Sequence, residues 1–450
     1  MIRTLLISTS VLGLAGCVSL NPVQRETSTE AGLIMPDGYD YAGAVDALAA
    51  PEQAWWASFK SADLDALVSE ALVANNTLAQ GVANVDASRA ALKTANAAFL
   101  PQASGSLSAS SNTQSGLDDV DANARLSASY QLDLFGANAA SRNAALANLD
   151  AAVFSQRALE LTAQSDVAAG WFNLLSAREQ LAVAKQNLEI SERIFKIVQV
   201  RYEAGAISGF DVSSQSASLA NARARIPQLE SQITSLETAL AILLGRVPQG
   251  YTAPEADVLS IALPNAEPGL PSDLLLRRPD LMQAEANLRA ANANIDAARA
   301  AFFPNIDLGA GLSSVLTGGG DLIGSLSASV AQNIFAGGRL DAQFESAQAR
   351  REAQLAGYRQ SILSALRDVD VSLKAIEANG AREAQLLIAR DAAADALRAA
   401  EIQYQAGTGD LTSLLNAQQN YFDAANSYVL GRLDRLTAAI NLYVAVGGGY

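Results

Sequence analysis

The side chains whose types and spacing could do chemistry gather in two short turns. Each turn combines a tyrosine, a glycine three residues later and a following aspartate: Tyr202, Gly205 and Asp211 in the first, and Tyr404, Gly407 and Asp410 in the second. A phenol can donate a hydrogen bond to a carboxylate, and a carboxylate at a helix start can accept hydrogen bonds from free backbone N–H groups. Both bonds fix helix ends, so the turns are predicted to position helices.

Little else in the 450 residues suits catalysis. The sequence has no histidine and a single cysteine, which removes the usual neutral-pH base and the commonest metal ligand. The glycine runs at 317–320 and 447–449 do not stand between a strand and a helix, as a phosphate-binding loop does. We therefore expect no enzyme activity, no metal site and no cofactor. The net charge of −15 and the pI near 4.5 also disfavour binding to nucleic acid.

The two turns close two long proline-free segments, 136–211 and 337–410, which are predicted to be helices. From Leu174 to Tyr202, apolar and small residues recur at alternating spacings of three and four, the pattern of helices that pack lengthwise. A helix of this length, at ~1.5 Å per residue, is roughly 100 Å long and needs partners along most of it. Landmarks before the helices also repeat, which indicates an internal duplication. They are Phe99-Leu-Pro101 with Phe302-Phe-Pro304, and Leu134-Phe-Gly136 with Ile334-Phe-Ala336.

The duplication divides the chain into segments. The first repeat covers 52–245 and the second covers 279–450, each with a helix, a β-hairpin, a long helix, a turn and a return helix; a proline-rich equatorial connector, 246–278, joins them. In the first repeat we expect one helix from Glu52 to Ala98, and a bend or break of the return helix at Pro227. The second repeat is predicted to begin its helix at Pro279.

Between the helices, the apolar period changes to two, which predicts strands. In 125–134 leucine, alanine and tyrosine share one face and polar residues the other, and 102–110, 306–312 and 322–330 alternate similarly. Each strand has about ten residues, the length of a tilted strand that crosses a bilayer. A soluble β-layer half buried against the helices is the alternative. Four strands cannot close a barrel, and open strand edges are not tolerated in lipid, so several chains must contribute; a trimer gives twelve strands.

The N-terminus is predicted to be an export signal. A basic start, an apolar run and Leu14-Ala-Gly-Cys17 indicate a signal peptide at 1–16, because the run is too short to span a membrane. Leu-Ala-Gly-Cys resembles the bacterial lipobox, which makes Cys17 the lipidated first residue of an extended segment, 17–51. A plain secretory signal with an incidental cysteine is the alternative.

Several motifs occur together along the chain: Leu14-Ala-Gly-Cys17, Trp55-Trp56, the two Tyr-x-x-Gly turns, Arg277-Arg-Pro-Asp280 and Ala300-Ala-Phe-Phe-Pro304. With these motifs the chain resembles the TolC-like outer-membrane efflux protein family, and more closely its lipid-anchored branch, which includes OprM and NodT. The resemblance implies a mainly α fold with β: a long-helix α-barrel tunnel plus four transmembrane β-strands per chain, which close as a 12-stranded barrel in a homotrimer.

The function that the resemblance implies is an exit duct of a tripartite efflux system. The duct would be lipid-anchored in the outer membrane and extend into the periplasm. It would dock to a periplasmic adaptor and an inner-membrane pump, of the RND type, and conduct small molecules passively. A duct for protein secretion and a structural coiled-coil lipoprotein of the periplasm are the alternatives. Because lipid-length strands have no use in a structural coiled coil, the hairpins favour a duct.

The resemblance also implies where a periplasmic gate lies, because the family's tunnel narrows where the helices meet the turns. Asp211 and Tyr404 would hydrogen-bond one helical hairpin to its neighbour, and Tyr202, Gly205 and Gly407 would form the tip turns. Family members often carry carboxylates at the positions of Ser413 and Asn416, which are uncharged here, so strong cation selectivity is in doubt. Asp410 could replace part of that ring. Ordinary helix capping is the alternative role for Asp211 and Asp410.

Overall fold

The computed structural model describes most of the chain, in the ranges 31–36, 38–40, 54–111, 120–264, 269, 271–316 and 321–448. The predicted signal peptide, Cys17 and most of the segment 17–51 lie outside the described residues. So do the two hairpin turns that we expect at 115–119 and 317–320.

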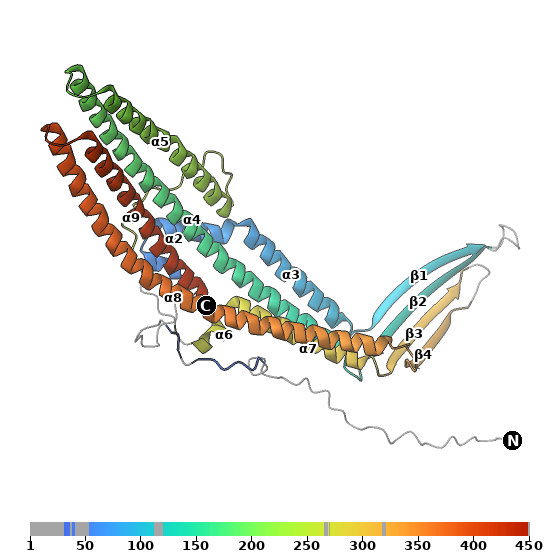
Figure 1. Ribbon diagram of the computed structural model, residues 1–450. Helices are drawn as coiled ribbons and strands as arrows, with labels where there is room; N and C mark the ends of the chain where they lie inside the picture. The colour runs from blue at the N-terminus through green and yellow to red at the C-terminus, as the bar shows by residue number, and fades with distance from the viewer. Residues whose placement is uncertain are drawn as a thin grey trace, which may run out of the picture. The chain divides into compact units, whose positions relative to one another are not determined.

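The same elements occur twice in the same order (Figure 1). The first series is α3 (Asn76–Ala97), β1 (Gln102–Ser111), β2 (Val120–Leu132), α4 (Ala137–Glu203) and α5 (Gly209–Leu243). The second series is α7 (Pro279–Ala300), β3 (Asn305–Val315), β4 (Ile323–Ala331), α8 (Arg339–Gln405) and α9 (Leu411–Ala445). Corresponding helices have equal lengths of 22, 67 and 35 residues. The structure therefore repeats the elements that the sequence pattern predicts.

One expectation about the first series is wrong, and one of the two alternatives at Pro227 is excluded. In place of one helix from Glu52 to Ala98, the structure has η1 (Trp55–Phe59), α2 (Ala62–Ala74) and α3. The interruption lies at Asn75, whose side-chain oxygen accepts hydrogen bonds from the backbone N–H groups of Thr77 (2.8 Å) and Leu78 (3.2 Å) and so starts a new helix. The break considered at Pro227 is absent, because α5 continues through this residue, and a bend there stays a prediction. A proline removes only one backbone donor, and the remaining hydrogen bonds of this 35-residue helix persist.

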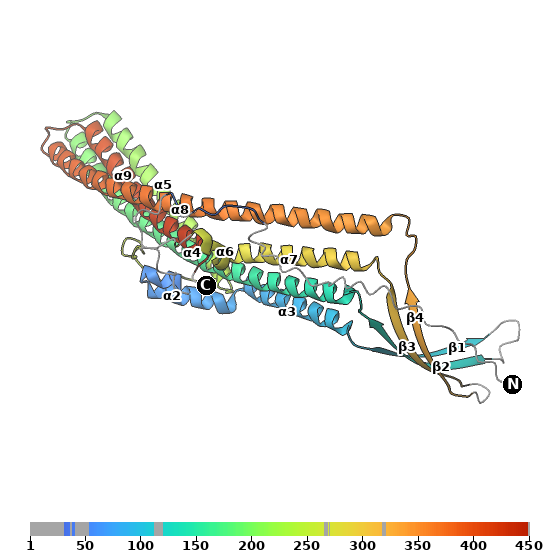
Figure 2. The same ribbon diagram turned by 90° about the horizontal axis from the view of Figure 1, so that it is seen from below.

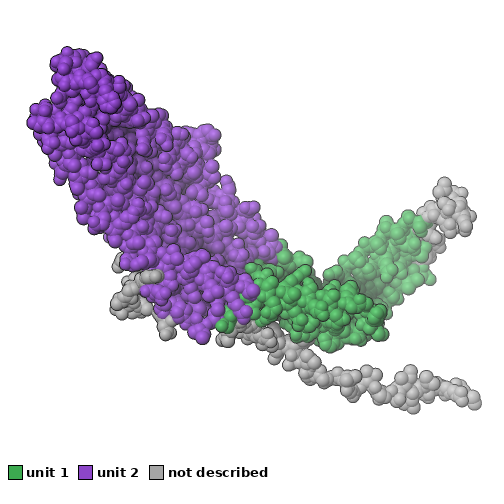
Figure 3. Space-filling view, viewed as in Figure 1, with its two compact units in different colours: residues 1–32, 89–148, 287–355 green, residues 33–88, 149–286, 356–450 purple. Residues whose placement is uncertain are grey.

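The described chain forms two compact units, each drawn from both halves of the sequence (Figure 3). Unit 1 contains 89–148 and 287–355, and therefore all four strands. They form one antiparallel sheet in the order β1-β2-β3-β4, with Gln102 opposite Ser129, Ala128 opposite Ala310 and Asn305 opposite Ala331. The two predicted hairpins are thus joined through β2 and β3. Among the described strands, β1 and β4 each keep one unpaired edge.

Unit 2 contains 33–88, 149–286 and 356–450. In it α5 returns along α4, and α9 returns along α8, as Figures 1 and 2 both show. The short elements η2 (Pro271–Asp273) and α6 (Leu274–Arg277) precede α7. Its largest apolar core includes Trp55, Trp56 and residues of α2, α4, α5 and α9. Trp55 stacks on Tyr443, with ring centroids 5.2 Å apart, and its Nε1 donates a 2.9 Å hydrogen bond to Gln164. The tryptophan pair is therefore a packing anchor of this core.

None of the helices in the described part of the chain is both long and apolar enough to cross a bilayer.

Candidate functional site

The candidate site is the pair of turns that reverse the long helices of unit 2. Gly205 and Gly407 have φ of +72° and +76°, in the left-handed region that favours glycine. The N–H of each glycine donates to the carbonyl oxygen of the tyrosine three residues earlier, at 2.9 Å for Tyr202 and 3.1 Å for Tyr404. The Tyr-x-x-Gly pattern therefore marks the end of each long helix, with glycine at the position where other residues would be strained.

The helices that leave the turns are capped by a serine and an aspartate in exchanged positions. α5 has Ser208 at its N-cap and Asp211 at its third position, whereas α9 has Asp410 at its N-cap and Ser413 at its third position. Asp211 Oδ2 accepts hydrogen bonds from the backbone N–H (3.0 Å) and hydroxyl (2.9 Å) of Ser208. Asp410 accepts 2.8 Å bonds from the backbone N–H and hydroxyl of Ser413.

Both aspartates are expected at helix starts, but only Asp410 precedes its helix, because Asp211 lies inside α5. Its equivalent in the second repeat is Ser413, 202 residues later, and the equivalent of Asp410 is Ser208. The hydrogen bonds from Ser413 hold the pKa of the Asp410 carboxyl below its ordinary value. Both aspartates therefore cap helices within the chain.

The two equivalent tyrosines differ in their surroundings. Tyr202 is 51% exposed, whereas Tyr404 is 2% exposed within a small apolar core formed by α4, α8 and α9. The Arg201 guanidinium carbon lies 4.7 Å from the centroid of the Tyr404 ring, and Nη1 of Arg201 donates a 3.0 Å hydrogen bond to the Tyr404 carbonyl oxygen. Burial raises the pKa of the Tyr404 phenol; Arg201 lowers it and the Asp211 carboxylate raises it.

The expected hydrogen bond between Tyr404 and Asp211 is not made within the chain. The Tyr404 hydroxyl is buried and has no hydrogen-bond partner in the described part of the protein. Asp211 instead uses its carboxylate on Ser208. The physical reason is local, since a helix-start carboxylate finds N–H and hydroxyl donors within its own turn. Asp211 lies near enough to Tyr404 to affect the pKa of its phenol. The two helical hairpins, α4 with α5 and α8 with α9, are instead joined through Arg201.

Sequence reasoning missed Arg201, because a basic residue in the last turn of a helix commonly complements the helix dipole. The signal that would have found it is the repeat itself: 202 residues later the equivalent position holds Gln403, which cannot make a cation–π contact. A second link between α4 and α8 is the ion pair of Arg193 with Glu401, at 2.9 Å. This pair is partly exposed, so we assign it a smaller contribution than the contact at Arg201.

Polar residues also line a cavity between α5 and α9 close to the turns, about 720 Å³ in volume. Asn416, which the sequence places at the gate, is exposed and lines this cavity together with Gln418. Gln418 is buried, and its Nε2 donates to Asn187 Oδ1 (2.9 Å) and Ser191 Oγ (2.5 Å) of α4. Gln215 of α5 donates to the Ser191 carbonyl oxygen at 2.9 Å. The two glutamines attach both return helices to one point of α4, and sequence reasoning missed them as well.

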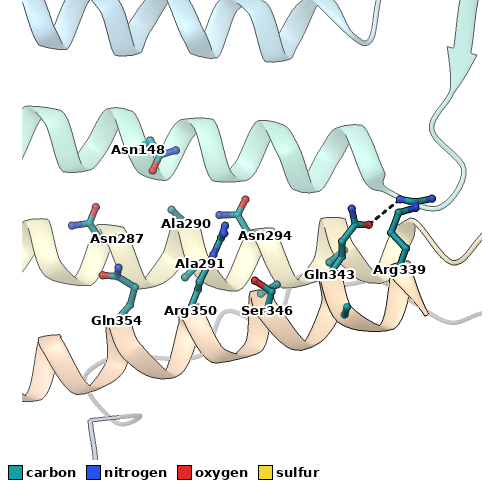
Figure 4. Close-up of a pocket in the computed structure, with 13 residues that line it drawn as sticks. Asn148, Asn287, Ala290, Ala291, Asn294, Arg339, Gln343, Ser346, Arg350 and Gln354 are labelled. Atoms are coloured by element: carbon teal, nitrogen blue, oxygen red, sulfur yellow. Dashed lines mark hydrogen bonds between the residues drawn. The ribbon is translucent and has the colours of Figure 1, made fainter. Parts of the chain in front are cut away.

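Unit 1 contains a second polar cavity, about 930 Å³ in volume, among α4, α7 and α8 (Figure 4). Its lining includes Arg339 and Arg350 of α8, several asparagine and glutamine amides, and no carboxylate. Figure 4 shows Arg350 directed toward α7. In a chain with a net charge of −15, this is a locally basic, hydrogen-bonding surface. It offers hydrogen-bond donors and acceptors but no nucleophile paired with a base.

Within the described ranges, no group of three or more acidic or cysteine side chains could hold a metal ion. The geometry therefore provides helix junctions, polar cavities and a sheet with open edges.

Comparisons with known proteins agree with one another. A family model described as "Outer membrane efflux protein" matches residues 67–246 and 270–448, one match for each half of the chain. The pyoverdine export outer membrane protein OpmQ of Pseudomonas aeruginosa is 35% identical over 441 residues, which cover 94% of this chain and 92% of the relative. The toluene efflux pump outer membrane protein TtgC of Pseudomonas putida is 31% identical over 97% of this chain and 93% of its own length.

Among solved structures, the open state of the Neisseria gonorrhoeae MtrE outer membrane channel superposes with a TM-score of 0.80 at 28% identity. The match covers 92% of this chain and 95% of that channel.

Proposed function

The chain belongs to the outer membrane efflux protein family, and from this premise we propose that it is the outer-membrane exit duct of a tripartite efflux system. The observation that carries the proposal is the repeated series of a lipid-length β-hairpin and a 67-residue helix that ends in a glycine turn. Such a series supplies a membrane-crossing sheet and a long helical wall from one chain. Its partners are a periplasmic adaptor and an inner-membrane pump, which we assign to the RND type.

The functional unit in this proposal is a homotrimer. The sheet has four strands and two unpaired edges among the described residues, and in lipid such edges must be paired. Three chains give twelve strands, an even number within the range of bacterial barrels. The long helices of three chains would similarly supply the wall of the periplasmic tunnel.

The gate of the tunnel is proposed at the turns. Arg201 and Tyr404 join the helical hairpin of α4 and α5 to that of α8 and α9. Asp211, Asp410 and Ser413 fix the starts of the return helices α5 and α9. Tyr202, Gly205, Gly407 and Asn416 complete this region. Ser413 and Asn416 are uncharged, and Asp211 and Asp410 are both engaged in caps, which supports weak cation selectivity.

The cargo is proposed to be a small molecule. Relatives of comparable identity are named for pyoverdine export and for toluene efflux, which are chemically unlike. A duct scaffold that serves such different solutes cannot select strongly among them, so the pump and the adaptor would set the cargo. A protein secretion duct is the second candidate function, and no observation on this chain favours it.

The N-terminal anchor is a further part of the proposal. Leu14-Ala-Gly-Cys17 supports cleavage before Cys17 and acylation of its thiol, and Val18, which is not an aspartate, is consistent with sorting to the outer membrane. Mass spectrometry of the mature N-terminus tests this part alone, and an unmodified Cys17 would refute it.

Deletion of the gene and complementation test the function as a whole. A deletion strain should accumulate a pump substrate such as a fluorescent dye, and the wild-type gene should restore efflux. Failure of a correctly inserted wild-type protein to restore efflux with any co-encoded pump would refute the proposal.

A further inference from the structure

One side of α8 in unit 1 carries polar and basic side chains and no carboxylate. The residues of α8 that contribute polar groups to the second cavity recur at spacings of four, three, four and four. They are Arg339, Gln343, Ser346, Arg350 and Gln354. These spacings keep the five side chains on one side of the helix, which we call the polar face of α8. The acidic residues of the same stretch, Asp341, Glu345 and Glu352, fall on other sides of the helix.

Amide side chains of two neighbouring helices face the same cavity. Asn287 and Asn294 of α7 lie two turns apart, and Asn148 of α4 completes the set. In Figure 4 the Arg350 side chain extends from α8 toward α7. The apolar side chains of the lining are all alanines, which give an acyl chain little surface to contact. The cavity of about 930 Å³ therefore suits a water-soluble molecule better than a lipid.

No carboxylate of the cavity lining neutralises its two arginines. Nη1 of Arg339 donates a 3.2 Å hydrogen bond to Oε1 of Gln343, which is a neutral amide. Arg350 is exposed and has no hydrogen-bond or ion-pair partner among the described residues. By contrast, the adjacent Arg351 lies on another side of α8 and forms a 2.6 Å ion pair with Glu352. The cavity therefore concentrates positive charge that is available to an anion.

The internal repeat shows that these arginines are not needed to build the helix. A shift of 202 residues relates the starts of α4 and α8, Ala137 and Arg339, and both helices have 67 residues. The positions of α4 that are equivalent to the polar face of α8 carry no charge. They are Ala137, Ser141, Ala144, Asn148 and Ala152. Because the same long helix forms with small neutral residues, Arg339 and Arg350 contribute something that the fold does not require.

We propose that this cavity binds a small organic anion, with its carboxylate groups on Arg339 and Arg350 and its hydroxyl or amide groups on the surrounding amides. The inference rests on the proposed efflux function and names a class of solute that the wall of the duct would bind. A guanidinium offers parallel N–H donors that match the two oxygens of a carboxylate. The two arginines stand about 16 Å apart along the helix axis, so a solute with several carboxylates can engage both long side chains.

The proposed binding is weak and reversible. Arg339 and Arg350 are both exposed, so solvent and salt screen their attraction for an anion. A conduit needs such a site, because a solute must bind well enough to enter and weakly enough to leave.

Titration calorimetry on the full-length protein in detergent at low salt tests the site, with citrate as the probe. Wild type should bind citrate, which carries three carboxylates and a hydroxyl, and should not bind the neutral triol glycerol. Arg350→Asn introduces the residue of the other repeat, as does Arg339→Ala. The double variant should bind citrate about tenfold more weakly or worse, because it loses the hydrogen bonds from two charged groups.

The matched control is Arg398→Asn, which removes the same charge from an exposed ion pair of α8 outside the cavity. Its citrate affinity should stay within about twofold of the wild-type value. Circular dichroism and light scattering establish that each variant is folded and has the wild-type oligomeric state.

Three results would overturn the site: a folded wild type that does not bind citrate, equal citrate affinity of wild type and the double variant, or an equal loss of affinity in Arg398→Asn. The last result would mean that binding follows the net charge of the chain. The proposed efflux function fails separately, when the wild-type gene does not restore efflux to the deletion strain, whatever the citrate titration shows.

Discussion

Arg201 makes two contacts with Tyr404, which together we call the Arg201 clamp. Its guanidinium carbon lies 4.7 Å from the centroid of the Tyr404 ring, and its Nη1 donates a 3.0 Å hydrogen bond to the Tyr404 carbonyl oxygen. The contact joins the end of α4 to the end of α8 next to both turns. In the repeat the equivalent of Arg201 is Gln403, so each chain has one such clamp, and a trimer would have three.

Replacing Arg201 should loosen the gate. Arg201→Gln, which introduces the residue of the other repeat, removes interactions worth about 2 kcal/mol per chain and should shift the population toward the open state. We expect raised bilayer conductance and greater sensitivity of cells to a large antibiotic such as vancomycin, at unchanged trimer content. The matched control is Arg193→Gln, which removes a partly exposed ion pair worth at most about 1 kcal/mol. Equal conductance of wild type and Arg201→Gln would contradict the clamp.

The Tyr404 hydroxyl and the Asp211 carboxylate should act separately. Tyr404→Phe removes a buried hydroxyl without a partner among the described residues, so thermal stability should stay equal or rise slightly. Asp211→Ala removes the partner of Ser208 and should destabilise the start of α5 by about 1 kcal/mol. If Tyr404→Phe alone raised conductance, its hydroxyl would have to bond to a neighbouring chain in the assembled gate.

Alkaline pH should weaken the helix packing at Tyr358. Burial, with a smaller effect of Glu285, raises the pKa of Tyr358 from 10.0 to about 12. Because the folded state disfavours the phenolate, the stabilisation is complete below pH 10.0 and is lost as the pH rises to about 12. The loss should be smaller in Tyr358→Phe than in wild type by about 1 to 2 kcal/mol, whereas the other buried tyrosines, such as Tyr404, keep their own raised pKa in both proteins. Thermal melts followed by circular dichroism at both pH extremes measure it, with Tyr202→Phe as the half-exposed control; identical pH dependence in all three proteins would disprove it.

Two substitutions of Trp55 should distinguish the contribution of ring packing to stability from that of the indole hydrogen bond. Trp55→Phe keeps an aromatic ring near Tyr443 but leaves the buried Gln164 oxygen without its donor, and should destabilise unit 2 by about 1 to 2 kcal/mol. Trp55→Ala also leaves a cavity and should lower stability by about 3 to 5 kcal/mol. Denaturant unfolding of the purified protein distinguishes them. Equal losses for the two variants would mean that the indole N–H, not the ring, dominates.

The turns and long helices could be predicted from the sequence because their causes are local. A glycine three residues after a tyrosine ends each helix with φ near +70°, and the three-and-four spacing before it defines the packed face. The predicted strand bounds are also close to those of the structure, because Pro101 and Pro304 directly precede the starts of β1 and β3. The break at Asn75 was missed because its cap depends on one side-chain oxygen in an otherwise helical composition.

The contacts between elements could not be predicted in the same way. Three contacts join residues that are far apart in sequence. They are the contact of Arg201 with Tyr404, the hydrogen bond of Gln418 to Ser191, and the stack of Phe135 on Phe303. The preference of Asp211 for Ser208 over Tyr404 is a competition between a donor three residues away and one nearly two hundred residues away. Residue types name the possible donors and acceptors, but only the packed helices decide which of them meet.

Single-channel recording of the purified full-length protein in a planar bilayer shows whether this chain forms an outer-membrane efflux duct. Light scattering on the same preparation would establish its oligomeric state. We expect discrete, long-lived conductance steps of a mostly closed, weakly cation-selective channel, and larger or more frequent steps for Arg201→Gln. A trimeric, membrane-inserted preparation in which neither wild type nor Arg201→Gln conducts ions would contradict it.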